Sequence, residues 1–484
     1  MANFGNESRP WKLNSAVISS QRYSPISIQI TDCISDINIY EDINKPFLTG
    51  KIAIVDFQGI FQDYGFNGDE KITLQIIRND TDAQTIERTF YLDYIMDSKI
   101  TSDAIAEVFY FHMVEDSEYE STMKNVNRYY EGKPSEIIRK IIQEYMPTKN
   151  FITTDTQRES NDILKVIIPN LTPMEAIQWV CQKAVSVEGL PYFLFTSLLS
   201  NNTILYMNLY TILTSKAMNR AEPYTFWQST IIQSNSRNTS NLETSILQNS
   251  YQILDYEESN NDNLRYLVDE GLIGSTHRYV DILNGQEQIV GHNINSTFYE
   301  LEKMGILSSQ NRLDYVHDVL STVDDENLGM SRHKKVYNYP SLNPYELGFS
   351  NNTSMSEENS TGKFSLKVNS LAILNLLYKR RIQVNTEGSK FLNLNSVLVG
   401  GLLDVNFLRL KGDDHILDNR KSGKQLITSV VHIFKKEDYS ITFELCKLEG
   451  RAKDLKVNSS GGQNAQEVST QFQEIGLFPK DYVA

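Results

Sequence analysis

The sequence predicts an α+β protein with two tube-like antiparallel β-barrel domains, an α+β middle domain, and an insertion of mixed helices and loops. Three observations lead to this fold class. Runs with apolar residues at every second position occur in both the first and the last quarter of the chain, and such spacing puts those residues on one face of a strand. Runs at helical spacing lie between them. The later strand runs also repeat, weakly, the spacing of the earlier ones.

The first barrel is expected at residues 23–115, after an N-terminal arm at residues 1–22. Within the run Lys71–Ile77, isoleucine or leucine occupies every second position. A pair of strands is not stable alone, so further strands must close around it. The expected strands are Ile26–Thr31, Phe47–Asp56, Lys71–Ile77, Thr89–Lys99 and Glu107–Val114.

The middle domain is expected at residues 116–236. Isoleucine pairs four residues apart in Pro134–Tyr145 form one apolar stripe of a helix. A second helix has a strong start signal, because Thr172 can cap it, Pro173 suits its first position and Glu175 completes a capping box. The strands expected beside these helices are Leu164–Ile168, Tyr192–Thr196 and Thr203–Leu209.

The second barrel is expected at residues 237–290 and 363–450, interrupted by the insertion at residues 291–362. Helices in the insertion are expected at Thr297–Met304 and Arg312–Leu320, and the Ser- and Asn-rich stretch 351–361 is expected to be a solvated linker. Residues 451–484 are expected to form a flexible C-terminal tail with an apolar end. The strands expected in the second barrel are Gln248–Asp255, Gly271–Leu283, Arg381–Thr386, Ser396–Phe407, Gln425–Lys435 and Ser440–Lys447.

A weak internal repeat supports two copies of one barrel. Three strand runs beginning after Gly68 match three strand runs beginning after Gly401 in their spacing. Leu92 then corresponds to Leu426, and the spacings between matched strands agree to within one residue. Identical residues are almost absent, so a chance match is the alternative.

Composition and charge exclude several classes of function. The formal net charge is −15, which argues against binding a nucleic-acid backbone, since phosphate neutralisation requires clustered Lys and Arg. The sequence contains no run of about 18 apolar residues, which a membrane-spanning helix would need. The first residues lack the apolar core of a secretory signal. Cys33, Cys181 and Cys446 are far apart and odd in number, so we expect reduced cysteines in a protein made in a cytoplasm.

No motif predicts a catalytic, cofactor or metal site. The seven histidines are scattered, and the adjacent Asp413, Asp414 and His415 diverge in space rather than converge on a metal, which favours a polar turn. The run Gly132–Ser135 resembles the end of a phosphate-binding loop but lacks its first glycine and its hydroxyl after the lysine. The sequence therefore predicts no enzyme, although a carboxylate dyad built from distant strands stays open.

Three stretches together resemble the baseplate central hub protein of T-even-type contractile-tailed phages. They are DINKPFLTGKIAIVDFQGIFQDYGFNGDEKITLQI, the helix in IIPNLTPMEAIQWVCQKA and the closing LITSVVHIFKKEDYSITFELCKLEG. The resemblance implies a homotrimer in the virion whose two barrels per chain form a ring of six. That ring would join the tail tube protein to the central spike protein, with the tape-measure protein and inner baseplate proteins as further partners. It also implies that acidic residues line a channel through which DNA slides without sticking.

We expect partner-docking residues in the loops that end the barrel strands and in the tail. The alternative for each loop is that it only closes a turn, and for the tail that it is disordered. The candidates are Asn44, Lys45 and Phe47, then Gln58, Phe61 and Tyr64, then Lys411, Asp413 and Asp414, and in the tail Ile475, Leu477, Phe478 and Tyr482.

Two other functions stay open. The first is the hub of a contractile injection or secretion machine, whose spike would be a separate chain. The second is a tail-associated enzyme or a sugar-binding adhesin. An enzyme would show a perturbed carboxylate or histidine cluster in a pocket, whereas a hub would show a trimer with a channel.

Overall fold

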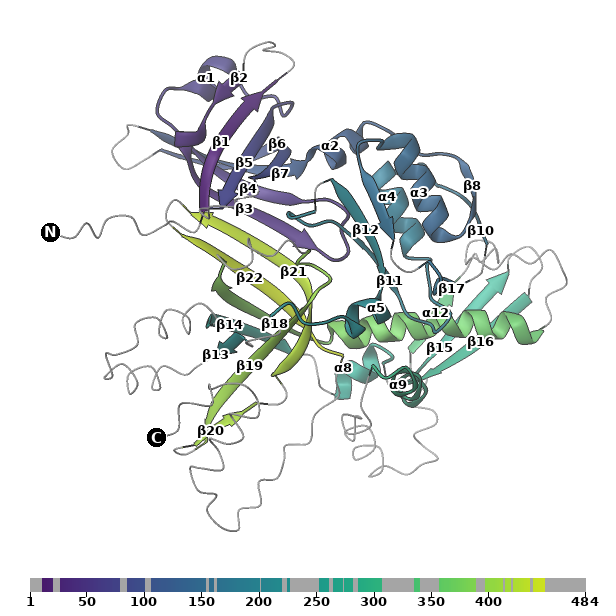
Figure 1. Cartoon of the computed structure of the whole chain (residues 1–484). Helices are drawn as coiled ribbons and strands as arrows, with labels where there is room; N and C mark the ends of the chain where they lie inside the picture. Colours follow the sequence, from purple (N-terminus) through teal and green to yellow (C-terminus); the bar gives the residue numbers. More distant parts are fainter. Residues whose placement is uncertain are drawn as a thin grey trace.

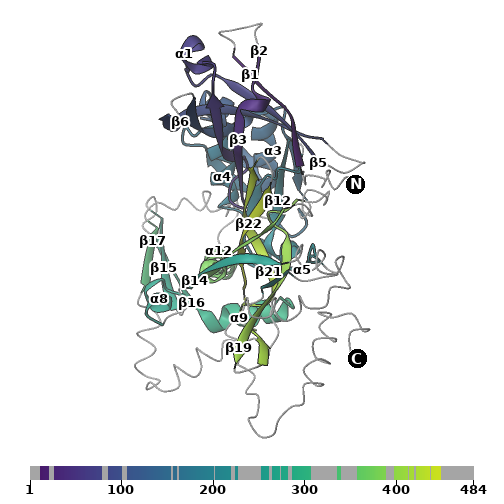
Figure 2. The same cartoon turned by 90° about the vertical axis from the view of Figure 1, so that its left-hand side faces the viewer.

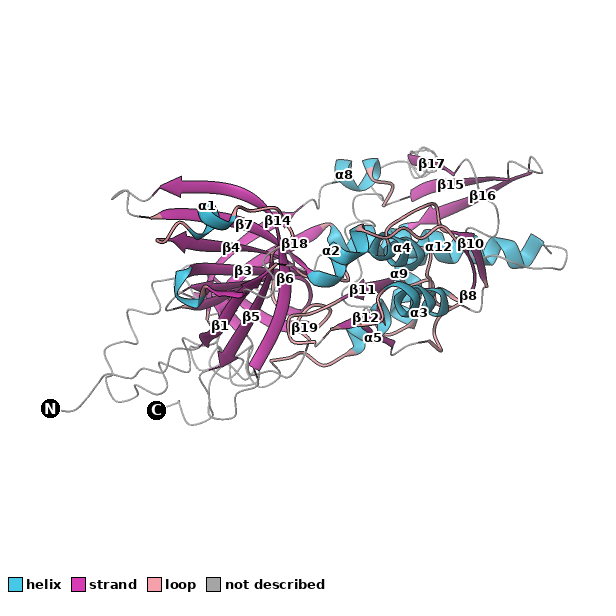
Figure 3. Ribbon diagram, turned by 90° about the horizontal axis from the view of Figure 1, so that it is seen from above, coloured by secondary structure: helices cyan, strands magenta, loops and turns pink. Residues whose placement is uncertain are grey.

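One large sheet, antiparallel except for one strand pair, organises the chain (Figure 1). The structure is a computed structural model, and it describes residues 11–20, 27–78, 85–100, 106–153, 156–160, 163–200, 202–219, 224–226, 252–260, 264–272, 274–281, 286–306, 335–339, 357–388, 397–411, 414–418, 421–435 and 438–448. Helices and three smaller sheets lie beside the large sheet (Figure 3). The predicted α+β class is therefore confirmed.

The first half of the large sheet, here called the first module, has the strand order β3-β4-β7-β6-β5-β1-β2. All its pairs are antiparallel. A 3-10 helix and the short helix α1 connect its strands. The elements are β1 Trp11–Ser19, β2 Ser27–Gln29, η2 Thr31–Cys33, β3 Ile34–Asp42, β4 Thr49–Asp56, α1 Ile60–Tyr64, β5 Lys71–Arg78, β6 Thr85–Ile100 and β7 Glu107–Glu115.

The other half, the second module, has the order β14-β18-β22-β21-β19-β13, with β20 on the outer part of β19. Its ladders are antiparallel except β13 with β19. The sheet of this module curls so that its two end strands come together. The ring centroids of Phe226 on β13 and Tyr256 on β14 lie 4.7 Å apart. The strands are β13 Tyr224–Phe226, β14 Ile253–Asn260, β18 Arg380–Glu387, β19 Leu402–Lys411, β20 Asp414–Leu417, β21 Gly423–Lys435 and β22 Tyr439–Cys446.

The two modules repeat one strand topology, with bulges at matching positions. In each, five strands follow in the same order, so that β3, β4, β7, β6 and β5 correspond to β14, β18, β22, β21 and β19. A bulge separates Leu92 from Tyr94 in the first module and Ile427 from Ser429 in the second. The Leu92 and Ile427 N–H groups each donate to a carbonyl at 2.9 Å, that of Glu70 and that of Gly401.

A second bulge confirms this correspondence. It falls between Ile34 and Asp36 in β3 and between Ile253 and Asp255 in β14. Bulges are positioned features of a ladder rather than random defects, so matching bulges in two ladders support a real duplication. The sequence match of Leu92 to Leu426 is one residue off, because spacing alone does not reveal where the extra residue of a bulge lies.

The middle domain packs two helices on small sheets and has its own apolar core. Ile137, Ile138, Ile141 and Ile142 of α3 are all buried in it. Thr172 accepts the Glu175 N–H and Glu175 accepts the Thr172 N–H, so the predicted capping box at α4 is confirmed. The elements are α2 Asp116–Thr122, β8 Tyr129–Gly132, α3 Pro134–Tyr145, β9 Asn150–Thr153, β10 Leu164–Ile167, α4 Pro173–Cys181, β11 Tyr192–Phe195, β12 Thr203–Asn208 and α5 Leu209–Thr214.

The insertion lies between β14 and β18 of the second module and stands to one side of it (Figure 2). Its three strands form a separate sheet of order β16-β15-β17. The long helix α12 buries Val368, Ile373 and Leu377 and leads directly into β18. The elements are α8 Leu264–Asp269, β15 Gly274–Asp281, β16 Gln286–Asn293, α9 Ile294–Lys303, β17 Lys335–Tyr339 and α12 Glu357–Tyr378.

Several expected bounds differ from the structure. The arm expected at residues 1–22 includes β1, which pairs with β5 from Trp11 to Ser19. Residues 274–281 form β15 of the insertion and not a strand of the second barrel, because β15 pairs with β16 and β17. The linker expected at 351–361 overlaps α12, which begins at Glu357. The helix expected at Arg312–Leu320 and the tail lie outside the described residues.

Candidate functional site: a buried polar junction

The two modules join edge to edge through strands β3 and β21. Seven residue pairs run antiparallel, from Ser429 opposite Asp42 to Lys435 opposite Asp36. Trp11 of β1 fastens the end of this ladder, since its indole N–H reaches the carbonyls of Lys435 and Asp438 at 3.1 and 3.0 Å. We call this ladder the in-chain junction. It makes the sheet continuous through both modules.

Glu41 lies near one end of the junction, opposite Val430, with its side chain fully buried. Its Oε1 accepts the Leu198 N–H at 2.6 Å, the Ser197 hydroxyl at 3.0 Å and the His432 Nε2 at 3.1 Å. The other ring nitrogen of His432 lies 2.8 Å from the Tyr439 hydroxyl. One carboxylate from β3 thus contacts the second module and the loop after β11 of the middle domain.

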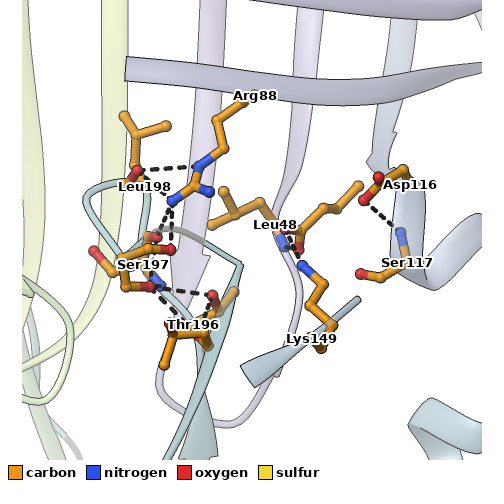
Figure 4. A network of polar contacts seen from close by, with 11 residues as sticks. Leu48, Arg88, Asp116, Ser117, Lys149, Thr196, Ser197 and Leu198 are labelled. Carbon is orange, nitrogen blue, oxygen red and sulfur yellow. Dashed lines mark hydrogen bonds and ion pairs between the residues drawn. The ribbon is translucent and has the colours of Figure 1, made fainter. Parts of the chain in front are cut away.

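Arg88 of β6 holds the same loop from the other side (Figure 4). Its guanidinium donates to the carbonyls of Leu198 at 2.6 Å, Ser197 at 3.0 Å and Ser200 at 2.5 Å. Burial lowers the pKa of Arg88, and the carboxylates of Glu115 and Glu41 oppose that shift. A guanidinium remains charged in proteins and carries five N–H donors, so one side chain can donate to three carbonyls of the same loop.

A buried ion pair joins the middle domain to the first module. The Lys149 ammonium lies 2.5 Å from Glu115 Oε1, and both side chains are almost fully buried. The second oxygen of Glu115 accepts the Leu48 N–H at 3.0 Å (Figure 4). A buried pair of this kind is costly to break from one side, because the remaining charge is left without a partner. The ion pair therefore fixes the middle domain against strand β7.

These contacts position three parts of the chain relative to one another. Among the described residues, no group of three or more His, Cys, Asp or Glu could hold a metal ion. No helix in the described ranges is long and apolar enough to cross a membrane. Burial raises the pKa of Tyr439 well above its ordinary value, so its hydroxyl keeps its proton beside His432. The three cysteines are unpaired, with Cys181 and Cys446 buried.

The candidates after β3 contact other parts of the same chain. Asn44 is exposed, yet its amide donates to the Tyr378 hydroxyl of α12 at 3.0 Å and its carbonyl accepts from Gln178 of α4 at 3.1 Å. Phe47 packs against the core of the middle domain. Lys45 is exposed. This loop therefore connects three regions within one chain, and docking of a partner there stays a prediction.

The candidates after β4 are divided between core and surface. Phe61 of α1 packs on Phe109 and Phe111 of β7, with ring centroids 5.1 and 5.0 Å away. Gln58 is exposed beside Phe57, whose exposed fraction is 63%. The backbone of Tyr64 ends α1. The structure thus leaves Gln58 and Phe57, and not Phe61, at the surface of this loop.

The remaining candidates lie at the end of the second module or beyond it. The backbones of Lys411 and Asp414 pair where β19 meets β20. Asp413 and the tail residues Ile475, Leu477, Phe478 and Tyr482 lie outside the described residues. The structure brings none of these residues together with the candidates of the first module within the described ranges.

The sequence analysis missed Glu41, Arg88 and His432. Each lies on the buried face of its strand, where the alternation predicts an apolar residue. Glu41 follows Ile37 and Ile39 at every second position, and Arg88 lies between buried Ile86 and Phe90. A charged residue on the buried face of a strand needs a hydrogen-bonding or oppositely charged partner. That signal was present, although it does not identify a partner hundreds of residues away.

No family model matches the sequence, and no curated protein matches it. Among solved structures, the chain is similar to a tail protein from Neisseria meningitidis, with 11% identity, coverage of 90% of this chain and 96% of that one, and a TM-score of 0.44. It is also similar to the 43 kDa tail protein of prophage MuSo2 from Shewanella oneidensis, with 9% identity, 89% and 97% coverage, and a TM-score of 0.48.

A third similar structure is the E. coli c3393 protein, described as a type VI secretion component with structural similarity to two T4 tail proteins. It is 10% identical, with 90% of this chain and 76% of that chain covered and a TM-score of 0.40. The neighbours are tail and secretion proteins.

Proposed function

We propose that the chain is the structural hub of a contractile phage-tail baseplate. Three copies would form a ring in which two modules per chain give six similar units around one axis. One face of that ring would meet a sixfold tail tube, and the other a threefold spike. The observation that carries the proposal is the duplication, in which strand order and bulges of the two modules agree.

The in-chain junction explains why duplication would serve this role. A threefold assembly offers six equivalent docking surfaces only if neighbouring modules are held in fixed relation. Here the relation is fixed by a seven-pair ladder and by the buried contacts of Glu41 and Arg88. A flexible linker between two modules would not fix that geometry.

The acidic charge fits a channel for DNA. A formal net charge of −15 gives the chain a surface that repels phosphate. In the proposed hub, DNA and the tape-measure protein would pass through the ring without adhering to its wall. The chain would act by assembly, with no chemical turnover.

Oligomeric state tests the proposal most simply. We expect mass photometry of the purified chain to show a trimer in equilibrium with the monomer. The trimer population should increase when a candidate spike protein is added. A chain that stays monomeric, or forms only dimers, both alone and with the spike would contradict the hub function.

A further inference from the structure

We propose that neighbouring copies join by the same strand pairing that joins the two modules within one chain. In this arrangement, residues 93–100 of β6 pair antiparallel with β14 of the next copy. The inference rests on the proposed function and names the two surfaces through which the ring closes.

The in-chain junction supplies the template. Strand β21 has two neighbours on one side: its first part pairs with β19, up to Leu426 opposite Leu402, and its second part pairs with β3 from Ser429 onward. The bulge between Ile427 and Ser429 marks the change of neighbour. One strand therefore continues its own module and also binds the next one.

Strand β6 is the counterpart of β21 in the first module. Its first part pairs with β5, as the first part of β21 pairs with β19, but within the described ranges its second part is paired on one side only. Strand β6 pairs with β5 up to Tyr91 opposite Lys71, and a bulge follows between Leu92 and Tyr94. From Asp93 to Ile100, β7 is its only strand partner in the described part of the chain. The backbone on this side of β6 is therefore an open edge. The corresponding side of β21 is paired with β3.

The counterpart of β3 is open as well. Strand β3 pairs with β4 on one side and β21 on the other, whereas β14 pairs with β18 and with no second strand among the described residues. One molecule thus carries the two halves of a second junction, on different modules. They can meet only between copies, because six strands lie between β14 and β6 in the order of the continuous sheet.

Apolar side chains along the open edge fit this role. Ile100 is 72% exposed, while its counterpart Phe434 is fully buried at the in-chain junction. Ile95 is 39% exposed, and its counterpart Val430 is fully buried. Tyr94 and Met96 are also exposed. An open strand edge that carries apolar residues is a template for pairing with another chain.

The correspondence also gives the register. A second bulge in β6, between Ile95 and Asp97, leaves Met96 without an opposite residue. Lys99, which is 67% exposed, comes opposite the exposed Glu257, so the register places opposite charges together. The expected pairs are Ile95 with Asn260, Asp97 with Ser259, Ser98 with Glu258, Lys99 with Glu257 and Ile100 with Tyr256.

Designed disulfides test this register in the full chain. Directly opposite residues of an antiparallel pair have Cα atoms about 4.5–5.5 Å apart, which suits a disulfide. The test variant carries Asp97→Cys and Ser259→Cys. The matched control carries Asp97→Cys and Glu257→Cys, two residues out of register. Both keep the three native cysteines, so the background reactivity is the same.

Under mild oxidation we expect the test variant to give covalent trimers on a non-reducing gel, and the control to remain mostly monomeric. Trimers by mass photometry without cross-links in the test variant would overturn this inference and leave the hub function standing. Equal cross-linking of test and control would overturn the register. A monomer at every concentration, with and without spike, would contradict both proposals.

Charge reversal gives an independent test. Lys99→Glu should place like charges together and raise the monomer–trimer midpoint concentration by roughly 2- to 30-fold per junction. Combining it with Glu257→Lys should restore assembly. The control Lys12→Glu makes the same charge change on β1, away from both edges, and should leave the midpoint unchanged. Equal effects of Lys99→Glu and Lys12→Glu, or no rescue by the double variant, would contradict the pairing.

Discussion

At the scale of the residue, Glu41 and Arg88 connect three parts of the chain through the loop 196–200. Glu41 accepts three donors on one oxygen, and Arg88 donates to three carbonyls. Removing one member of such a network leaves buried partners unsatisfied, which costs more than the hydrogen bonds contribute on balance. Glu41 and Arg88 therefore hold this loop of the middle domain against the first module, and Glu41 also contacts the second.

We expect Arg88→Met to lower the free energy of unfolding by about 3–5 kcal/mol, because three buried carbonyls lose a charged donor. Arg88→Lys should lose less, since an ammonium keeps the charge but cannot span all three carbonyls. Urea denaturation followed by circular dichroism measures both. A loss in Arg88→Met no larger than in the exposed-site variant Lys12→Met would show that this contact does not hold the junction.

Glu41→Gln keeps the size of the side chain and removes its charge. We expect a loss of about 1–3 kcal/mol, because the Leu198 N–H, Ser197 and His432 then share a weaker acceptor. The control is Asp36→Asn on the same strand, which should change stability by less than about 0.5 kcal/mol. Similar losses in both variants would rule out a special role for Glu41.

Glu118 of α2 provides a prediction about pH. Burial, with Glu175 and Glu115 nearby, raises its pKa from 4.5 to about 7, and its Oε2 is buried without a hydrogen-bond partner. A carboxyl with a raised folded-state pKa holds its proton longer when folded, so stability declines as the pH rises from about 4.5 to about 7.

We therefore expect Glu118→Gln to match the parent protein below that window and to be more stable above it, by about 1–3 kcal/mol. Unfolding in urea between pH 4 and pH 8 measures the difference, with Glu120→Gln on the exposed side of α2 as the control. If the stability difference between Glu118→Gln and the parent protein stayed constant across this pH range, titration of Glu118 would not be the cause of the pH dependence.

At the scale of the element, local signals predicted what local contacts stabilise. The α4 capping box was read from Thr172, Pro173 and Glu175 alone, and the structure has it. We expect Thr172→Ala to cost about 1 kcal/mol and Thr172→Ser to cost little, because Ser retains the capping oxygen. Thermal unfolding would show this, and equal losses from Ala and Ser would mean that the cap does not stabilise the helix.

The elements that the sequence analysis missed lack clean periodicity. In β1 a bulge between Leu13 and Ser15 shifts the alternation, so buried Trp11 and Ala16 do not share one period-two series. Strand β3 carries a bulge and Glu41 in its buried phase. The first turns of α12 are Ser-, Glu- and Asn-rich, which is typical of a linker, and its stability comes from apolar residues further along.

At the scale of the whole molecule, the duplication was predicted from strand spacing, but the junction was not. Glu41 and His432 are 391 residues apart in the sequence, and no local pattern links them. The same holds for the β3–β21 ladder, because strand pairing over such separation depends on tertiary packing. The sequence therefore predicted the two modules and not the single sheet that they share.

The acidic composition leads to one prediction for the assembled protein. We expect the trimer to bind a short DNA duplex more weakly than the roughly 10⁻⁴–10⁻⁶ M typical of non-specific binding at physiological salt. Fluorescence anisotropy with a labelled duplex measures this. Micromolar binding that weakens steeply with added salt would indicate a basic surface and would contradict the proposed channel.

The proposed hub places six modules from three chains around one axis. A cryo-electron microscopy map of the assembled particle tests it most directly. We expect the first and second modules to alternate around an open channel, each related to the next by about one sixth of a turn. A map in which only one module per chain lines the channel, or in which the modules share no axis, would contradict the account.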